Sequence, residues 1–130
     1  MMKLPRIHNR AGFTLIELLV VMAIIATLLT ISVPRYFNSL DRSKETVLRH
    51  DLATMRDAID KYSADKGKYP DSLATLVDER YLRHTPVDPL TESSDSWLTD
   101  SPDDLSSTGI SDVHSGAEGV GIDGTEYGQW

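Results

Sequence analysis

Hydrophobic and polar positions follow different patterns in the two halves of the chain. Residues 13–33 read FTLIELLVVMAIIATLLTISV, an apolar run whose only charged side chain is Glu17. A helix over this run would be about 30 Å long, which matches the hydrocarbon thickness of a bilayer. The pattern therefore predicts a transmembrane helix over residues 13–34.

After residue 35 the apolar positions thin out and recur every three or four residues, with charged residues between them. The members of this stripe are Leu48, Leu52, Met55, Ile59 and Tyr62. Such spacing gives an amphipathic helix one apolar face, and Gly67 is a suitable stop. We predict a helix over residues 35–66 that packs its stripe within a globular domain over residues 35–130.

Pro34 separates the transmembrane stretch from the amphipathic one. Proline has no N–H to donate, and its ring crowds the preceding helical turn. We therefore expect a helix kink at Pro34, with helix on both sides of it.

A turn and a short helix are expected after the long helix. Pro70 favours a turn because its ring fixes the backbone. Asp71 or Ser72 can then cap a short helix through a side-chain oxygen. We predict this helix over residues 71–79.

The remaining residues 90–130 are rich in Ser, Asp, Gly and Thr, which is typical of loops. Segments 96–99 and 110–113 contain enough apolar residues to form short strands. We expect a small antiparallel sheet of two or three strands. The predicted fold class is α+β, with a long N-terminal helix packed on this small sheet.

Charge is distributed unevenly along the chain. Residues 1–12 carry three basic side chains and no acid, residues 13–83 are balanced, and residues 84–130 carry ten acids and no Lys or Arg. Phosphate binding needs clustered Lys and Arg, so we predict no nucleic-acid partner. The acidic region suits a solvated surface or one that collects cations. The absence of cysteine excludes disulfides and thiolate metal sites.

Residues 1–12 have the features of a leader. Basic residues before an apolar span keep that end cytoplasmic, so the domain after the span is exported. An ordinary secretory signal has a shorter apolar core, with its small-residue cleavage site after that core. Here the small-residue junction Ala11-Gly12 precedes the run. A peptidase cutting between Gly12 and Phe13 would remove the charges and leave the apolar helix on the mature protein.

Glu17 is the anomaly of the apolar run. An ionised carboxylate in lipid costs at least about 2.5 kcal/mol, and such residues are usually functional. Cleavage would free the amine of Phe13, four residues away, and Glu17 could pair with it in the same molecule. Glu17 could equally reach the amine of a neighbouring molecule and set the stagger between subunits. The alternative is an acid that is simply favoured by the helix N-terminus.

The string GFTLIELLVVMAIIATLLTISVPRY resembles the class III signal and N-terminal helix of type IV pilins and type II secretion pseudopilins. The matching positions are Gly12, Phe13, Glu17 and Pro34. The resemblance implies that a prepilin peptidase cleaves after Gly12 and that Phe13 becomes N-methylated. It also implies that Glu17 acts in subunit recruitment and assembly.

Residues 67–89, from GKYPDSL to PVDP, are similar to the major, G-type pseudopilin. Adhesive pilins commonly carry a cysteine pair, which is absent here. The resemblance implies a homo-polymer with other pseudopilins, extracted from the bacterial inner membrane by an assembly platform, with its C-terminal domain in the periplasm. The family usually has a tryptophan-glycine turn directly after Pro89. Here the tryptophan is Trp97, which leaves open whether this is the main subunit or a paralogous one.

A cation site is one interpretation of the glycine-rich segment 115–124. Glu118 and Asp123 lie five residues apart with glycines between them, and Ca²⁺ prefers six to eight oxygens from a loop that can wrap around it. Resemblance to G-type pseudopilins implies a structural calcium held by Glu118, Asp123 and the backbone of Ser115. The alternative is a glycine-rich turn with ordinary surface acids.

No enzyme constellation is legible in the sequence. His50 lies on the charged helix, His84 and His114 are isolated along the chain, and no glycine loop opens a predicted helix. We predict a structural subunit of a type II secretion pseudopilus rather than an enzyme. The alternatives are a type IV pilus or competence pilin, acting in adhesion, motility or DNA uptake, and a signal-anchored periplasmic enzyme or binding module.

Overall fold

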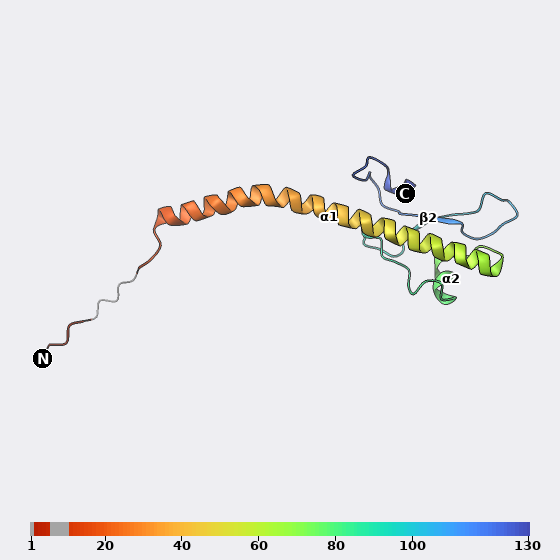
Figure 1. Ribbon diagram of the computed structural model, residues 1–130, viewed down its shortest axis with the longest axis horizontal. Helices are drawn as coiled ribbons and strands as arrows, with labels where there is room; N and C mark the ends of the chain where they lie inside the picture. The colour runs from red at the N-terminus through yellow and green to blue at the C-terminus, as the bar shows by residue number, and fades with distance from the viewer. Residues whose placement is uncertain (1, 6–10) are drawn as a thin grey trace. The chain divides into compact units, whose positions relative to one another are not determined.

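The computed structural model describes residues 2–5 and 11–130 (Figure 1). The elements in chain order are α1 (Leu15–Lys66), α2 (Leu73–Asp78), β1 (Leu98–Asp100), β2 (Asp112–His114) and the 3-10 helix η1 (Tyr127–Gln129). One long helix and a small antiparallel sheet confirm the predicted α+β class.

The chain divides into two compact units, and α1 contributes to both. Unit 1 extends to Asn38, and unit 2 extends from Ser39 to Trp130. α1 begins two residues after Phe13 and includes Pro34 as an internal residue, with helix on both sides of it. A kink at Pro34 stays a prediction.

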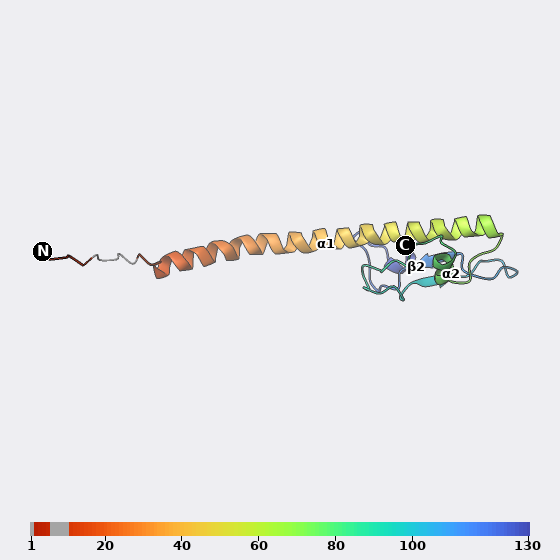
Figure 2. The same ribbon diagram turned by 90° about the horizontal axis from the view of Figure 1, so that it is seen from below.

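Unit 2 is built around the apolar stripe of α1. In Figures 1 and 2, α2 and the strands lie beside the yellow-to-green part of α1, which belongs to this unit. All five stripe residues are buried, as their spacing predicts. The other buried apolar side chains are Ala58, Leu76, Leu82, Trp97, Ile110 and Val113. The core therefore joins α1 and α2 to one strand and the connecting loops.

The turn between the helices follows the sequence signals closely. Gly67 ends α1 in the left-handed region at φ 71°, where its N–H donates to the Ser63 carbonyl at 2.9 Å. Ser72 caps α2 by accepting a hydrogen bond from the Thr75 N–H at 3.3 Å. α2 lies within the predicted range 71–79 and is shorter than it.

The sheet has two antiparallel strands of three residues each. Asp100 lies opposite Asp112, and Leu98 lies opposite His114. The strands begin two residues later than the predicted segments 96–99 and 110–113. Because side chains alternate along a strand, Val113 enters the core while Asp112 and His114 share the other face.

Candidate assembly site

Within residues 2–5 and 11–130, no part of the chain covers the apolar part of α1 in unit 1. Its most apolar window is 0% buried, although the helix is long and apolar enough to cross a membrane. Individual side chains range from Leu15 at 76% exposed to Val33 at 44%. Soluble monomers rarely expose an apolar patch of more than a few hundred Å². This surface is therefore suited to being surrounded by lipid or by other apolar helices.

Two threonine hydroxyls along this surface are already satisfied within the helix. Thr27 donates to the carbonyl of Ala23 at 2.8 Å, and Thr30 donates to that of Ala26 at 2.8 Å. Such bonds to the preceding turn leave no free hydroxyl donor to be desolvated. The two threonines are therefore compatible with an apolar environment.

Glu17 forms a reciprocal pair with Thr14 at the start of α1. The Thr14 N–H donates to Glu17 Oε2 at 3.1 Å, and the Glu17 N–H donates to Thr14 Oγ1 at 3.2 Å. This arrangement is a capping box, which satisfies two backbone donors that a helix start leaves free. Sequence analysis considered the helix dipole at Glu17 but missed Thr14. The spacing T-x-x-E was the available signal.

Glu17 also borders a shallow hollow of the helix surface. The hollow is lined by Phe13, Ile16, Glu17, Val20 and Val21. Glu17 is the one charged residue among these lining residues. A second apolar helix lying here would bury the carboxylate, so that a positive partner would become valuable.

The Gly12–Phe13 bond lies outside regular structure in an open position. Residues 11–14 precede α1, and Phe13 is 95% exposed. Apart from its two chain neighbours, no described residue has an atom within 4 Å of the position that a Cβ on Gly12 would take. The predicted leader 1–12 falls partly on residues 1 and 6–10, which lie outside the described residues. The junction itself is described and accessible.

The predicted calcium residues lie in different surroundings. Glu118 is exposed and lines a hollow with Val120 and Glu126, whereas Asp123 lines another with Arg49. Ser115 is fully buried, and its hydroxyl donates to the Asp88 carboxylate. Neither hollow contains both Glu118 and Asp123. The calcium site stays a prediction.

Asp123 is engaged by neighbours that favour its ionised form. Hydrogen bonds from the Thr125 hydroxyl at 2.6 Å and the Thr125 N–H at 3.0 Å, together with the Arg49 guanidinium at 3.1 Å, hold the pKa of this carboxyl below its ordinary value. A cation binding at Asp123 would therefore compete with Arg49.

Three side chains of α1 that sequence analysis did not single out hold the segment 119–130: Glu45, Arg49 and Arg56, whose guanidinium donates to the main-chain oxygen of Trp130. Glu45 Oε1 accepts from the Ile122 N–H at 2.8 Å and from the Tyr127 hydroxyl at 2.9 Å. The Arg49 guanidinium lies 3.8 Å from the centre of the Trp130 ring. No local motif marks Glu45 or Arg49, because their partners lie more than seventy residues away in the sequence.

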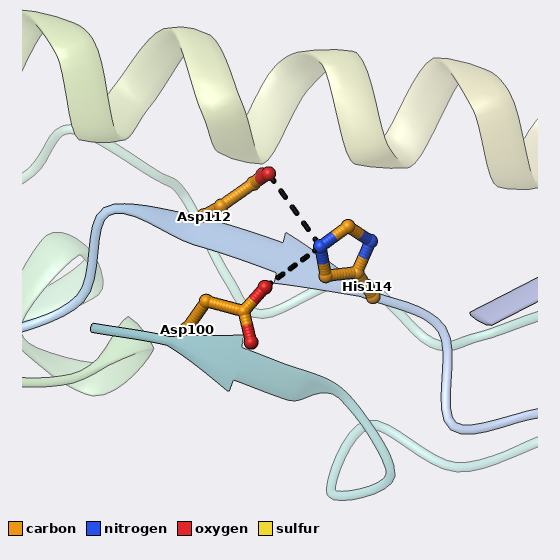
Figure 3. A group of neighbouring side chains, drawn as sticks. All are labelled: Asp100, Asp112 and His114. Carbon is orange, nitrogen blue, oxygen red and sulfur yellow. Dashed lines mark ion pairs between the residues drawn. The ribbon is translucent and has the colours of Figure 1, made fainter. Parts of the chain in front are cut away.

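The interpretation of His114 as isolated was wrong. Its Nε2 lies 2.9 Å from Asp100 Oδ2 and 3.5 Å from Asp112 Oδ2 (Figure 3). Sequence analysis missed the group because Asp100 comes from the other strand, and its register opposite Asp112 exists only in the folded sheet. His50 and His84 are exposed.

The chain is similar to several known proteins. Residues 7–33 match the family model described as the prokaryotic N-terminal methylation motif. The type II secretion system core protein G of Pseudomonas aeruginosa is 31% identical to the chain, over 95% of this chain and 96% of that protein.

Two further relatives are pilin-like proteins with shorter matches. The competence protein ComGC of Halalkalibacterium halodurans is 30% identical, over 65% of this chain and 81% of its own length. The type IV wide pilus major component PilA4 of Thermus thermophilus is 36% identical, over 62% and 60%. No solved structure matches the chain.

Proposed function

Because the chain belongs to the type II secretion system core protein G family, we propose that it is a structural subunit of a secretion pseudopilus. The subunits polymerise through the apolar helix of residues 13–33. The observation that carries this function is the exposed apolar surface of α1, which has one carboxylate, Glu17, next to the cleavable junction. Other pseudopilins of the same family are further partners.

Processing precedes assembly in this proposal. A prepilin peptidase cleaves the accessible bond between Gly12 and Phe13, and the new terminal amine of Phe13 is methylated. The match of residues 7–33 to the N-terminal methylation motif supports this step. Cleavage removes Lys3, Arg6 and Arg10 and creates one positive charge close to Glu17.

The capping box explains how Glu17 is tolerated before assembly. Thr14 supplies a backbone donor to the carboxylate, so a single molecule does not carry a bare charge in lipid. During assembly the amine of Phe13 from a neighbouring subunit takes over as the partner of Glu17. An ion pair formed in an apolar surrounding depends strongly on geometry, which would set the stagger between subunits.

Burial of apolar side chains drives polymerisation in this proposal. Once an assembly platform in the inner membrane extracts the helices from lipid, they bury one another in the centre of the fibre. The N-terminus stays cytoplasmic before extraction, and unit 2 lies in the periplasm. The function is structural, so we infer no enzymatic activity.

A type IV pilus or competence pilin is the second candidate function. The similarity to ComGC and PilA4 favours it, over 65% and 62% of this chain. Core protein G matches 95% of the chain, including its C-terminal region, and therefore favours the secretion pseudopilus. The acidic residues 84–130 argue against direct DNA binding by this subunit.

The assembly role is tested by replacing Glu17. Glu17→Ala is expected to abolish incorporation into fibres while membrane insertion continues, because insertion depends on the apolar run. Asp60→Ala, which removes an exposed acid elsewhere on α1, is the matched control and should assemble normally. Fibre yield after shearing and membrane fractionation measure the two properties. Normal fibres from Glu17→Ala would remove the assembly role.

Processing is tested by mass spectrometry of the mature protein. The expected N-terminus is methylated Phe13. Retention of Met1 or Met2, or a start at another residue, contradicts cleavage after Gly12.

We also propose that the segment 115–124 binds a structural calcium through Glu118, Asp123 and the backbone of Ser115. Calcium at millimolar concentration is then expected to raise the melting temperature by mass action, and Glu118→Gln is expected to reduce the shift. An unchanged melting temperature in the parent protein ends the calcium proposal without touching the assembly role.

A further inference from the structure

The face of the sheet that points away from the core carries a compact group of three side chains. Asp100, Asp112 and His114 offer ligand atoms that all lie within 4.8 Å of one another. Figure 3 shows the imidazole of His114 between the two carboxylates, one from each strand. The side chain of His114 is only 20% exposed, whereas Asp100 at 60% exposed keeps the group open to solvent.

Both ring nitrogens of His114 face oxygen atoms. Nδ1 lies 2.8 Å from the main-chain oxygen of Trp130, and Nε2 lies 2.9 Å from Asp100 Oδ2 and 3.5 Å from Asp112 Oδ2. A neutral imidazole has one N–H and one lone pair. If Nδ1 donates to Trp130, the lone pair of Nε2 points at two carboxylates. In that tautomer a metal ion at Nε2 would be shared with both carboxylates.

Two of the three ligand-atom distances are close to those around a small divalent cation. With bonds of about 2.0–2.2 Å, a tetrahedral Zn²⁺ holds its ligand atoms roughly 3.3–3.6 Å apart. The distance from Nε2 to Asp112 lies in this range. The distance to Asp100 is shorter by a few tenths of an ångström, and this exposed side chain can move outward.

The neighbours of the group orient the ligands without occupying them. Arg56 Nε donates to Asp112 Oδ1 at 2.7 Å and leaves Oδ2 directed at His114. The bond from Nδ1 to Trp130 fixes the ring so that Nε2 is the free ligand. Hydrogen bonds of this kind are the usual support of a histidine that binds metal.

We propose that Asp100, Asp112 and His114 form a binding site for Zn²⁺ or a similar transition-metal ion on unit 2. The ion would be bound by two carboxylate oxygens and one imidazole nitrogen, with water completing the coordination. It would tie β1 to β2 on either side of the loop 101–111 and, through Arg56 and Trp130, stiffen the attachment of the C-terminal segment to α1. The site is independent of the assembly helix and of the calcium prediction.

The test is calorimetric titration of the full chain in detergent with zinc chloride. The expected result is saturable binding that both His114→Asn and Asp100→Asn weaken at least about tenfold, since losing even an outer-shell partner costs 10–100-fold. In His114→Asn the amide N–H can still donate to Trp130, so the support of the fold is kept. His84→Asn and Asp103→Asn replace exposed residues of the same types and should bind like the parent.

A second measurement identifies the ligand atom directly. Nitrogen NMR of the His114 ring should show zinc at Nε2, and millimolar calcium should not displace it because calcium prefers oxygen ligands. Tryptophan fluorescence checks that each variant is folded. If His114→Asn does not fold, Asp100→Asn still tests the proposal, because the Asp100 side chain is 60% exposed and its replacement should not disturb the fold. Absence of saturable binding, or equal affinity in the parent and Asp100→Asn, overturns the proposal.

Discussion

The two units of the chain use apolar side chains in opposite ways. In unit 2, Leu52 is 2% exposed and surrounded by protein, whereas Leu28 in unit 1 is 59% exposed. Both belong to α1, so the difference lies in what covers each part of the helix. Unit 2 covers its apolar face with its own chain. Among the described residues, none covers the predominantly apolar surface of unit 1.

Carboxylates differ between the units in a similar way. Asp88 in unit 2 is fully buried and accepts hydrogen bonds from the Ser115 hydroxyl and the Leu90 N–H. Glu17 in unit 1 has only Thr14 as a hydrogen-bond partner among the described residues. An acid that is completely satisfied within its own chain supports a fold, whereas one with a single local partner is available for a neighbouring subunit.

The largest predicted effect is the difference in stability between variants of Leu52 and Leu28. Leu52→Ala is expected to lower the free energy of unfolding of unit 2 by about 2–5 kcal/mol, because it leaves a cavity in a packed core. Leu28→Ala removes the same atoms from an exposed surface and should leave this value unchanged. Denaturant unfolding followed by tryptophan fluorescence measures it, since both tryptophans lie in unit 2. Equal losses of unfolding free energy in the two variants would contradict the difference between the two units.

Asp88→Ala is expected to have the next largest effect on the free energy of unfolding. It leaves the Ser115 hydroxyl and the Leu90 N–H without their acceptor inside the protein, which is expected to cost about 2–3 kcal/mol. Asp95→Ala replaces an exposed acid of the same unit and should change stability little. The same unfolding measurement applies. A loss no larger than that of the control would show that Asp88 does not stabilise unit 2.

Replacing Arg49 measures how much partly exposed contacts contribute to the stability of unit 2. Arg49→Ala removes the stacking on Trp130 and the ion pair with Asp123, both partly exposed, and is expected to cost about 0.5–1 kcal/mol. Arg49→Lys keeps the charge but loses the planar stacking, so it should fall between Arg49→Ala and the parent. A parent-like Arg49→Ala would mean that Glu45 and Arg56 are enough to hold the C-terminal segment.

The smallest predicted effect concerns the titration of Tyr81, whose side chain contacts the end of α1. Its hydroxyl donates to Asp65 at 2.7 Å, and this bond raises the pKa of Tyr81 to about 12. The raised value means that the contribution to stability is complete below pH 10 and is lost as the pH rises towards 12. NMR titration should show this pKa, and Asp65→Asn should return it towards 10. An unchanged value in Asp65→Asn would contradict the assigned cause.

Much of the fold follows from local patterns in the sequence. The stripe from Leu48 to Tyr62 predicted the buried face of α1, and Ser72 and Gly67 predicted a cap and a stop. These features depend on hydrogen bonds and side-chain spacing within a few residues. The strands begin two residues later than predicted, because short strands in a polar segment are positioned by their partner rather than by their own propensity.

What the sequence alone determined is the character of the N-terminal segment: an apolar helix, one acid, and a small-residue junction before it. These properties depend on residue order, since a helix in lipid needs no tertiary partner to satisfy its backbone. Only the tertiary structure brought Asp100 to His114, Asp88 to Ser115, and Arg49 to Trp130. Those pairs arise from strand register and from loops packed on α1, and neither is encoded by spacing along the chain.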